Sequence, residues 1–336
     1  MDEIIAVTPT NVADPEKMHY LLKSAEANNF SIKMVGLGQP FGWVERMIWF
    51  RDYLQDFPYE ENPIICFTDA YDVFYTDDLE TIKNKFLAFN CEIVWSVEKF
   101  YSHQLEEDRA FYERLCPTSY GYKYINAGTC IGYRTTLLKL FNDILEVSLQ
   151  DDAFISRFKN LPAHPHTHPY RGKVISGSDQ SWISHQICQY WNKYNIKMDY
   201  LCDIFYVPCG DWDNLEKYVG SNLRIIATGK RPSVIHVPWI QKYDHVFIKL
   251  FNTAYNVLQG KTYTWEFNTI TFLDDGKLEA FGQGTYKQLS SHIFQADFAL
   301  RAHILIFTED YSKFTSVRKD DNEIVRGQFI SGGSCA

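Results

Sequence analysis

The stretch that most constrains the fold of this chain runs from Pro63 to Tyr75 and reads PIICFTDAYDVFY. Its first part, Ile64–Phe67, is a short apolar run of the kind found in strands that are buried on both faces of a parallel sheet. Asp69 and Asp72 follow this run. We therefore expect two carboxylates at the carboxyl end of a buried strand, which is where open α/β sheets bind ligands.

These two carboxylates have no basic neighbour within the stretch. They repel each other unless a cation lies between them. A divalent cation such as Mn²⁺ or Mg²⁺, which also binds a diphosphate, would remove that repulsion. The alternative is an ordinary acidic turn in which Asp72 caps a helix, and the stretch alone leaves both interpretations open.

The rest of the first 260 residues alternates between apolar strands and amphipathic helices, which predicts an α/β fold with a mostly parallel sheet flanked by helices. We expect one domain over residues 1–260. The expected strands are 4–7, 32–37, 64–67, 92–97, 200–205 and 233–239, and the expected helices are 14–28, 46–57, 79–89, 136–149, 179–194 and 245–259.

Residues 261–336 have a different pattern, with β-rich runs and an Asp275-Gly276 pair that is typical of a hairpin turn. They predict a smaller antiparallel β domain, sandwich-like or half-barrel. We expect a structural or oligomerisation role for it, with acceptor binding as the alternative. Free edge strands would allow a homodimer through this domain.

Composition excludes several functions. The formal net charge of -9 argues against a nucleic-acid-binding surface. No apolar run approaches the roughly 18 residues of a membrane span, and the acidic N-terminus does not resemble a signal peptide. The eight cysteines lack CxxC spacing and are expected to be reduced, with disulfides as the alternative. These features predict a cytoplasmic protein with no membrane partner.

Three further features have both a functional and a structural interpretation. Small residues within Tyr124–Tyr133 would let the backbone approach a ligand, but they also suit a strand with a bulge. His164, His166 and His168 could bind zinc, although a stiff exposed loop is the favoured interpretation. His236 is flanked by apolar residues, and by itself it is typical of a buried histidine with ordinary partners.

Four segments together resemble a known family. They are FTDAYDVFY (67–75), YINAGTCIGY (124–133), SDQ (178–180) and VIHVPW (234–239), in this order. The chain is similar, over roughly residues 1–250, to collagen glycosyltransferases of the GT-A fold, such as the glycosyltransferase domain of procollagen lysyl hydroxylases and the collagen glycosyltransferases of giant viruses. The resemblance implies a GT-A-type, Rossmann-like domain that uses a UDP-sugar and a divalent metal.

The resemblance also implies roles for individual residues. Asp69, Asp72 and His236 would bind Mn²⁺, with Mg²⁺ as the alternative, and the metal would bridge the phosphates of the donor. Thr8, Tyr71, Arg46 and Asp69 would contact the UDP-sugar: Tyr71 by stacking on uracil, Thr8 by facing the nucleotide, and Arg46, where the family has a lysine, by facing a phosphate. Trp43 would cover the sugar, and Asn126 and Asp179 would line the sugar and acceptor side.

Two departures from the family pattern affect the substrate. Ser176-Gly177-Ser178 precedes Asp179 where the family has a longer acidic run, and Val237-Pro238-Trp239 replaces a glycine-asparagine-glycine. Both leave the sugar and the acceptor open. The iron-binding signature of the hydroxylase domain is missing as well, so lysyl hydroxylation is not expected.

The expected function is a hexosyltransferase that transfers glucose from UDP-glucose to galactosylhydroxylysine of a collagen-like protein, with retention. The alternatives are a UDP-galactose-dependent hydroxylysine galactosyltransferase and a UDP-sugar transferase with a non-collagen acceptor. A different class, a non-catalytic sugar- or collagen-binding protein on a decayed scaffold, is disfavoured because Asp69, Asp72, Asp179 and His236 are all present. The missing signal peptide fits a viral or intracellular enzyme, or a chain without its leader.

Overall fold

A computed structural model of the 336-residue chain provides the structure. It describes residues 3–58, 60–101, 105–150, 168–170, 173–175, 179–220, 223–238, 240–255, 258, 260–273, 276–290, 293–308 and 311–332. The chain forms two compact units, Met1–Ile248 and Lys249–Ala336. The boundary expected from the sequence, residue 260, falls inside the second unit.

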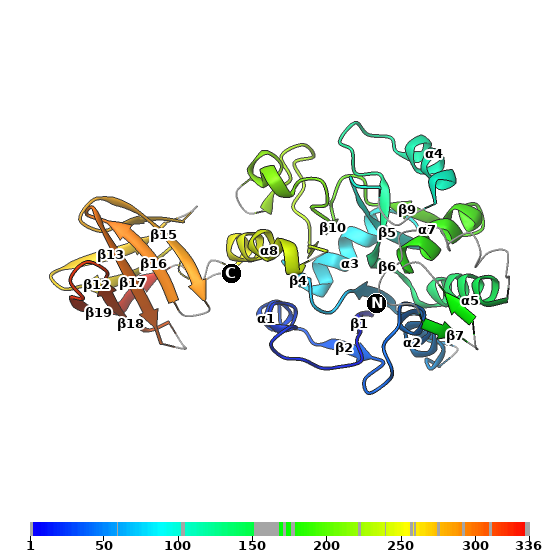
Figure 1. The fold of residues 1–336 in the computed structure, drawn as a ribbon, viewed down its shortest axis with the longest axis horizontal. Helices are drawn as coiled ribbons and strands as arrows, with labels where there is room; N and C mark the ends of the chain where they lie inside the picture. The colour runs from blue at the N-terminus through cyan, green and yellow to red at the C-terminus, as the bar shows by residue number, and fades with distance from the viewer. Residues whose placement is uncertain are drawn as a thin grey trace. The chain divides into compact units, whose positions relative to one another are not determined.

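The first unit is built on a six-stranded sheet, whose strands lie in the order β2 (Ile32–Val35), β1 (Ile4–Pro9), β3 (Ile64–Thr68), β6 (Tyr124–Tyr133), β5 (Ile93–Glu98) and β9 (Ile196–Met198) (Figure 1). β6 is antiparallel to both neighbours, and every other neighbouring pair is parallel. The sheet is thus mixed. The carboxyl ends of β1, β3 and β5 and the amino end of β6 therefore lie at the same end of the sheet.

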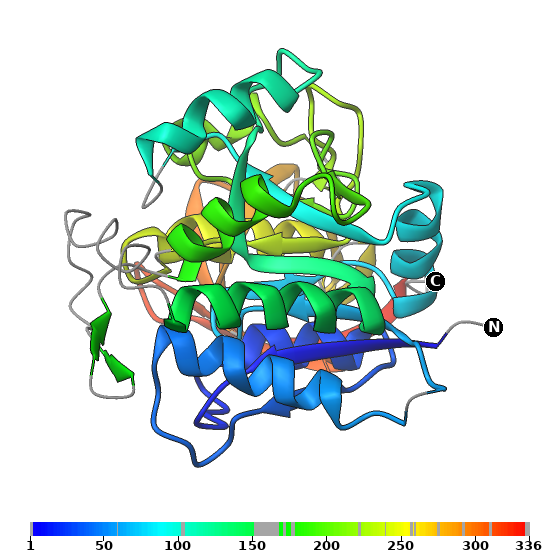
Figure 2. The ribbon, with the colours of Figure 1, turned by 90° about the vertical axis from the view of Figure 1, so that its right-hand side faces the viewer.

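Helices cover both faces of this sheet because β3 is apolar on both sides, as its sequence predicts. Ile64 and Cys66 belong to the cluster that also contains buried residues of α1 (His19–Ala27) and α3 (Leu79–Ala88). Phe67 points the other way and packs on Phe50 of α2 (Trp43–Gln55), with ring centroids 4.6 Å apart. Figure 2 shows α2, α5 (Arg134–Gln150) and α7 (Asp179–Tyr190) side by side on that second face.

A three-stranded sheet lies next to the end of the sheet that carries the carboxyl ends of β1, β3 and β5. Its order is β10 (Phe205–Tyr206), β11 (Val234–His236) and β4 (Val73–Tyr75). β11 runs antiparallel to β4, with His236 opposite Val73. The backbone N–H of Val237 donates to the carbonyl of Asp72 at 2.9 Å. This pairing brings the end of β11 to the segment that follows β3.

The remaining elements among the described residues of the first unit are α4 (Glu106–Leu115), η2 (Trp212–Lys217), β7 (His168–Tyr170) and β8 (Lys173–Ile175), and the residues of α8 (Ile240–Ala254) belong partly to each unit. His164, His166, Ser176–Ser178 and Trp239 lie outside the described residues. Among the residues that the structure describes, no helix is both long and apolar enough to cross a membrane. The seven cysteines in this part of the chain all have free thiols.

The strand expected over residues 200–205 is wrong. Between β9 and β10 the chain turns around the carboxylate of Asp199, which accepts the backbone N–H groups of Asp203, Ile204 and Phe205 at 2.7–2.8 Å. Cys202 has a φ of 54° inside this turn, which no strand allows. Apolar composition alone therefore suggested a strand where a buried carboxylate organises a turn.

Four helices begin at other residues than expected: α2 begins at Trp43 instead of residue 46 and α5 at Arg134 instead of residue 136, and the larger differences are in α1 and α8. Asp14 accepts the N–H groups of Glu16 and Lys17 in a preceding turn, and α1 itself begins at His19. α8 begins at Ile240, before the expected start at His245, with non-helical backbone angles at Tyr243. Helix starts are hard to place from sequence because capping residues also stabilise turns.

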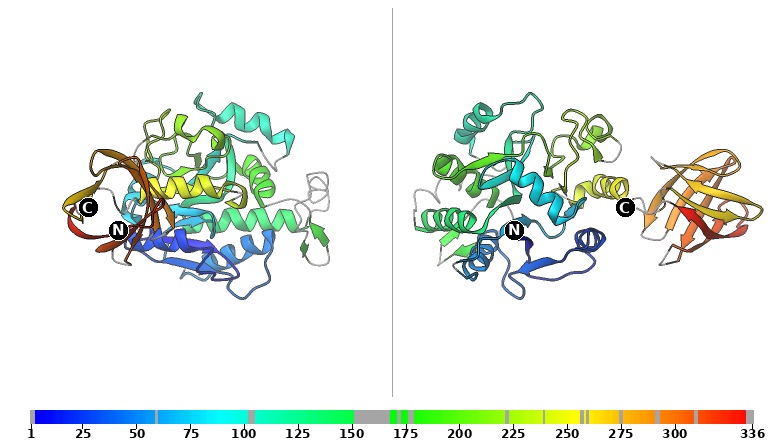
Figure 3. Two further views of the ribbon diagram at one scale, coloured as in Figure 1. Left: turned by 60° about the vertical axis from the view of Figure 1, so that its left-hand side comes forward. Right: turned by 180° about the vertical axis from the view of Figure 1, so that it is seen from behind.

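The second unit is a closed antiparallel barrel of strands β12 (Lys261–Trp265), β13 (Asn268–Phe272), β14 (Lys277–Glu279), β15 (Gln283–Ser290), β16 (Ile293–Phe298), β17 (Arg301–Phe307), β18 (Lys313–Arg318) and β19 (Ile324–Gly332) (Figure 3). Gly276, with a φ of 70°, lies in the predicted hairpin between β13 and β14, while Asp275 lies outside the described residues. The expected sandwich or half-barrel is wrong because β19 pairs with β12 and closes the barrel. A closed barrel has no free edge strands, so the sequence-based reason for a homodimer no longer applies.

Candidate metal and nucleotide site

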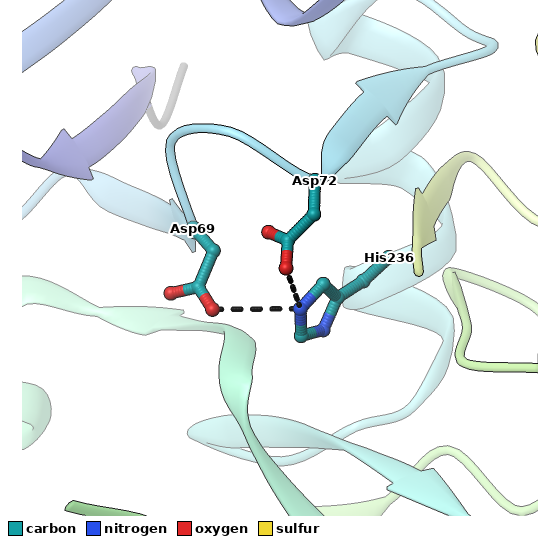
Figure 4. A group of neighbouring side chains, drawn as sticks. All are labelled: Asp69, Asp72 and His236. Carbon is teal, nitrogen blue, oxygen red and sulfur yellow. Dashed lines mark ion pairs between the residues drawn. The ribbon is translucent and has the colours of Figure 1, made fainter. Parts of the chain in front are cut away.

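Three potential ligands of a metal ion meet where the six-stranded and the three-stranded sheets of the first unit adjoin. Asp69 directly follows β3, Asp72 precedes β4, and His236 ends β11. Figure 4 shows both carboxylates pointing at the same ring nitrogen. Nε2 of His236 lies 3.4 Å from Oδ2 of Asp69 and 3.5 Å from Oδ2 of Asp72. The structure thus brings together the three residues that the family resemblance implied as ligands.

The alternative interpretation of Asp72, as the cap of a helix, is wrong. Residues 73–75 form the strand β4, and α3 begins later, at Leu79, with Asp78 as its N-cap. The side chain of Asp78 accepts the N–H of Thr81 at 2.7 Å. Asp72 therefore has no capping role.

Gly128 of β6 allows the backbone to pass directly beside this cluster. Its carbonyl accepts the N–H of Asp69 at 2.8 Å. A β-carbon on Gly128 would overlap Cε1 of His236 and lie 2.7 Å from Oδ2 of Asp69. The strand interpretation of this segment is confirmed, because β6 is a strand opposite a bulge between Trp95 and Val97. The approach of its backbone to a ligand stays a prediction.

Arg46, in the first turn of α2, joins two of the expected site carboxylates. Its guanidinium donates one hydrogen bond to Oδ1 of Asp69 and another to Oδ2 of Asp179, the first residue of α7. The side chain of Arg46 is 8% exposed, and its guanidinium carbon lies 5.5 Å from the ring centroid of Trp43. Burial opposes the charged guanidinium, but Asp179 and Asp69 raise the pKa of Arg46. Arg46 therefore holds Asp69 and Asp179 near each other through an ion pair with each carboxylate.

The site carries an excess of acidic groups. Burial raises the pKa of Asp69 to about 6, although Arg46 and His236 act in the opposite direction. Burial also disfavours the imidazolium of His236, but Asp72 and Asp69 attract a proton strongly enough to raise the pKa of His236 above its ordinary value. The carboxylates that attract this proton would also attract a divalent cation.

The ligand set fits such a cation. In the described part of the chain, Nε2 of His236 is buried and has no hydrogen-bond partner. One ligand atom from each of Asp69, Asp72 and His236 lies within 4.8 Å of the others. Two carboxylates and an imidazole form a donor set that suits Mn²⁺.

Asn126, expected on the sugar side, contacts His236 from β6. Its Oδ1 lies 3.0 Å from Nδ1 of His236 and accepts the N–H of Gly128 at 2.9 Å. Its Nδ2 lies 3.4 Å from Oε2 of Glu98. Asn126 is 3% exposed and so belongs to the floor of the site.

Sequence reasoning missed Glu98 and Gln180. Glu98 ends β5, is 1% exposed, and accepts Nε2 of Gln180 at 2.9 Å. Burial raises the pKa of Glu98. Two signals could have identified these residues. Glu98 directly follows a buried strand, as Asp69 does, and Gln180 is part of the SDQ segment.

Thr8 and Tyr71 lie at the same end of the six-stranded sheet as the three potential ligands. The buried hydroxyl of Thr8 donates to the carbonyl of Thr68 at 2.9 Å, which ties the ends of β1 and β3 together. The hydroxyl of Tyr71 lies 3.0 Å from Oγ1 of Thr10 and donates to the carbonyl of Val12. Tyr71 thus holds the loop after β1 against the Asp69–Asp72 turn.

A second group of potential ligands consists of Glu107, Asp108 and His185. Nδ1 of His185 lies 3.0 Å from both carboxylate oxygens of Asp108. Both residues are buried, and their contact joins α4 to α7. This pair stabilises the packing of two helices.

Comparison with known proteins finds similarity in the first part of the chain. Residues 3–156 match the family model described as the PLOD GT domain. The matched segment contains Thr8, Trp43, Arg46, Asp69, Tyr71, Asp72 and Asn126, whereas Asp179 and His236 lie beyond it.

Curated relatives of this chain include procollagen lysine hydroxylases. The multifunctional procollagen lysine hydroxylase and glycosyltransferase LH3 of Rattus norvegicus is 24% identical over 148 residues, which is 41% of this chain and 19% of that protein. The procollagen-lysine,2-oxoglutarate 5-dioxygenase 2 of Mus musculus is 22% identical over 160 residues, which is 45% of this chain and 21% of that protein. The match thus spans about a fifth of the length of these relatives.

A solved structure is similar as well: that of a glycosyltransferase involved in the glycosylation of the major capsid of PBCV-1, with 10% identity, a TM-score of 0.41, and coverage of 73% of this chain and 98% of the other. The family model and the curated relatives do agree with each other. Residues 3–156 are thus similar to the glycosyltransferase domain of the procollagen lysine hydroxylases.

Proposed function

We propose that this protein is a metal-dependent GT-A-type glycosyltransferase that transfers glucose from UDP-glucose to galactosylhydroxylysine of a collagen-like protein. The observation that carries the proposal is the convergence of Asp69, Asp72 and His236 in a chain whose first half is similar to a glycosyltransferase domain. His236 lies outside the matched segment, so its arrival at the two aspartates is independent support. Donor and acceptor follow from the resemblance to collagen-modifying enzymes.

Asp69, Asp72 and His236 would hold Mn²⁺, or Mg²⁺ in its place. The cation would supply positive charge at the diphosphate of the donor and so stabilise the negative charge that develops on the departing UDP. The site supplies suitable ligands but little free positive charge of its own. The guanidinium of Arg46 is already shared between Asp69 and Asp179.

The chain's own residues would prepare this site in three ways. Arg46 keeps Asp69 and Asp179 close together although both are acidic. Tyr71 holds the loop after β1 in place through Thr10, where the nucleotide would lie. Asp179, at the amino end of α7, would face the sugar and the acceptor.

Transfer with retention requires the new bond to form on the face of the sugar that the phosphate leaves. The bond between C1 of glucose and the β-phosphate oxygen breaks, and a bond from C1 to the acceptor hydroxyl oxygen forms. The hydroxyl proton passes to the departing phosphate oxygen. This mechanism needs no protein nucleophile, and it predicts an α-linked product from the α-linked donor.

The test is UDP release in the presence of Mn²⁺, with UDP-glucose and UDP-galactose, with and without a galactosylhydroxylysine peptide. We expect release from UDP-glucose that rises with the peptide. Asp72→Asn should reduce it at least about 100-fold, because a metal ligand contributes several kcal/mol to transition-state stabilisation. The control is Asp213→Asn, which alters an exposed aspartate and should leave release unchanged.

Other results would contradict specific parts of the proposal. Release that persists without divalent metal would exclude the metal site as the centre of the reaction. Release that requires UDP-galactose and a hydroxylysine peptide would instead favour the galactosyltransferase, and release that only a non-collagen acceptor stimulates would exclude collagen. A β-linked product, observed by NMR during the reaction, would exclude retention.

A further inference from the structure

The side-chain amide of Asn126 has a fixed orientation. Its Oδ1 lies 2.9 Å from the backbone nitrogen of Gly128. A backbone N–H can only donate, so the atom of Asn126 that faces Gly128 must be the oxygen. The amide nitrogen then points to Oε2 of Glu98, at 3.4 Å, and a carboxylate accepts it. The hydrogen bonds with Gly128 and Glu98 thus require the same orientation of the Asn126 amide.

This orientation determines the protonation of one nitrogen of His236. Oδ1 of Asn126 lies 3.0 Å from Nδ1 of the imidazole. An amide oxygen has no hydrogen to donate, so the hydrogen of this contact belongs to Nδ1. The other ring nitrogen, Nε2, is left facing Asp69 and Asp72 at 3.4 and 3.5 Å. With Nδ1 engaged, Nε2 is the atom that remains to bind a cation.

The support for Asn126 extends further into the protein. Glu98 accepts Nε2 of Gln180 through its other oxygen at 2.9 Å. Oε1 of Gln180 in turn accepts the backbone N–H of Ala127 at 3.3 Å. These contacts connect β5, β6 and the first turn of α7. Asn126 and Glu98 are both nearly inaccessible to solvent, so water does not compete for their hydrogen bonds.

We propose that Asn126 is a positioning residue. It keeps the proton of His236 on Nδ1 and thereby presents Nε2 to the metal between Asp69 and Asp72. Glu98 and Gln180 hold the amide of Asn126 in the orientation that this role requires. The inference rests on the metal-dependent function proposed above. Outer hydrogen bonds of this kind fix the ring orientation and tautomer of metal-bound histidines.

The first test observes the proton directly. Protein labelled with ¹⁵N at histidine is examined by long-range ¹H–¹⁵N NMR, and the signals of His236 are identified by their loss in His236→Gln. We expect Nδ1 to carry a proton both without metal and with Mg²⁺, which is diamagnetic, while Mg²⁺ shifts Nε2. An unprotonated Nδ1 in either state would overturn the inference.

The second test measures Mn²⁺ affinity by isothermal titration calorimetry. Asn126→Ala should weaken binding about 10- to 100-fold, as loss of an outer hydrogen-bond partner typically does. Asn62→Ala is the matched control, because Oδ1 of Asn62 also accepts a backbone N–H, that of Thr135 at 2.9 Å, but on the exposed surface. This control should bind Mn²⁺ like the unaltered protein.

A double variant distinguishes positioning from a general effect on folding. Asn126→Asp combined with Glu98→Gln exchanges the amide and the carboxylate and conserves the net charge. The acceptor for Nδ1 of His236 remains, and the amide at position 98 can donate to the carboxylate at position 126. We expect Mn²⁺ affinity within about tenfold of the unaltered protein and a protonated Nδ1.

The results separate this inference from the proposed function. If the unaltered protein binds neither Mn²⁺ nor Mg²⁺, the proposed function is wrong, whereas the NMR measurement still reports the protonation of Nδ1. If Asn126→Ala binds Mn²⁺ normally, or the double variant loses the proton on Nδ1, the positioning role is overturned. Should Asn126→Ala fail to fold, the double variant decides.

Discussion

Gly128 lies directly against the imidazole of His236, so that a β-carbon at position 128 would lie 2.7 Å from Nδ1 of that ring. Real side chains do not approach so closely, and either β6 or the histidine would have to move. We expect Gly128→Ala to weaken Mn²⁺ binding at least about tenfold, since displacing a ligand disturbs the whole metal site. Titration calorimetry measures this effect.

The matched control is Gly220→Ala. A β-carbon at Gly220 would meet its nearest neighbour at an ordinary 3.7 Å. This variant should bind Mn²⁺ normally. Equal affinities of the two alanine variants would show that His236 is not held where the structure places it.

The double contact of Arg46 with Asp69 and Asp179 leads to a prediction about stability. Arg46→Leu leaves the buried carboxylate of Asp179 and the partly buried carboxylate of Asp69 without their partner, which should lower the free energy of unfolding of the first unit by about 3 to 5 kcal/mol. The measurement is urea denaturation. Addition of Mn²⁺ should recover part of the loss, because the cation replaces the missing positive charge beside Asp69.

The control for Arg46 is Arg109→Leu. Arg109 also contacts two carboxylates, those of Glu106 and Glu113, but its side chain is 47% exposed. Surface ion pairs of this kind contribute less than about 1 kcal/mol. If both variants lost equal stability, the buried pairing of Arg46 would not be the cause.

Asp77 should make stability depend on acid pH. Burial opposes its ionisation, but the hydroxyl of Ser233 and the charges of Lys85 and Arg231 together lower the pKa of Asp77 below its ordinary value of 3.8. The folded state therefore releases this proton more readily than the unfolded state, so the stabilisation is complete above the ordinary pKa and is lost as pH falls through the lowered one. Asp77→Asn should be less stable by about 1 to 3 kcal/mol near neutral pH.

The difference between Asp77→Asn and the unaltered protein should shrink as the pH falls below the ordinary pKa of aspartate. Unfolding by urea at a series of pH values measures it. A difference that stays constant down to the most acidic pH would mean that the charge of Asp77 does not provide the stabilisation.

The barrel should depend on its aromatic core. Phe314 is 2% exposed, and its ring lies 5.6 Å from that of Tyr263 and from that of Trp265. Phe314→Ala should destabilise the barrel by about 3 to 5 kcal/mol, because it removes buried apolar surface and leaves a cavity. Thermal unfolding followed by tryptophan fluorescence reports the change. Phe267→Ala alters a fully exposed ring of the same unit and should have almost no effect.

Local sequence patterns were reliable where the physical cause is local. The run Ile64–Phe67 predicted a strand buried on both faces, and Gly276 marked a hairpin turn. The order of residues in the chain also places Asp69 and Asp72 just after that strand. The turn around Asp199 was not predicted. Its backbone N–H groups donate to the carboxylate of Asp199 rather than to a neighbouring strand, and composition does not reveal such a contact.

The sequence by itself determined the alternation of strands and helices, the change to a β-rich second unit, and the presence of acidic residues after β3. Only the tertiary structure decided that β6 runs antiparallel, that β19 closes the barrel, and that His236 meets Asp69 and Asp72 through the pairing of β11 with β4. Periodicity and turn preferences act between near neighbours and can be read from the chain. Strand direction, register and side-chain contacts depend on free energies summed over segments far apart in sequence, and they are settled only when the whole domain packs.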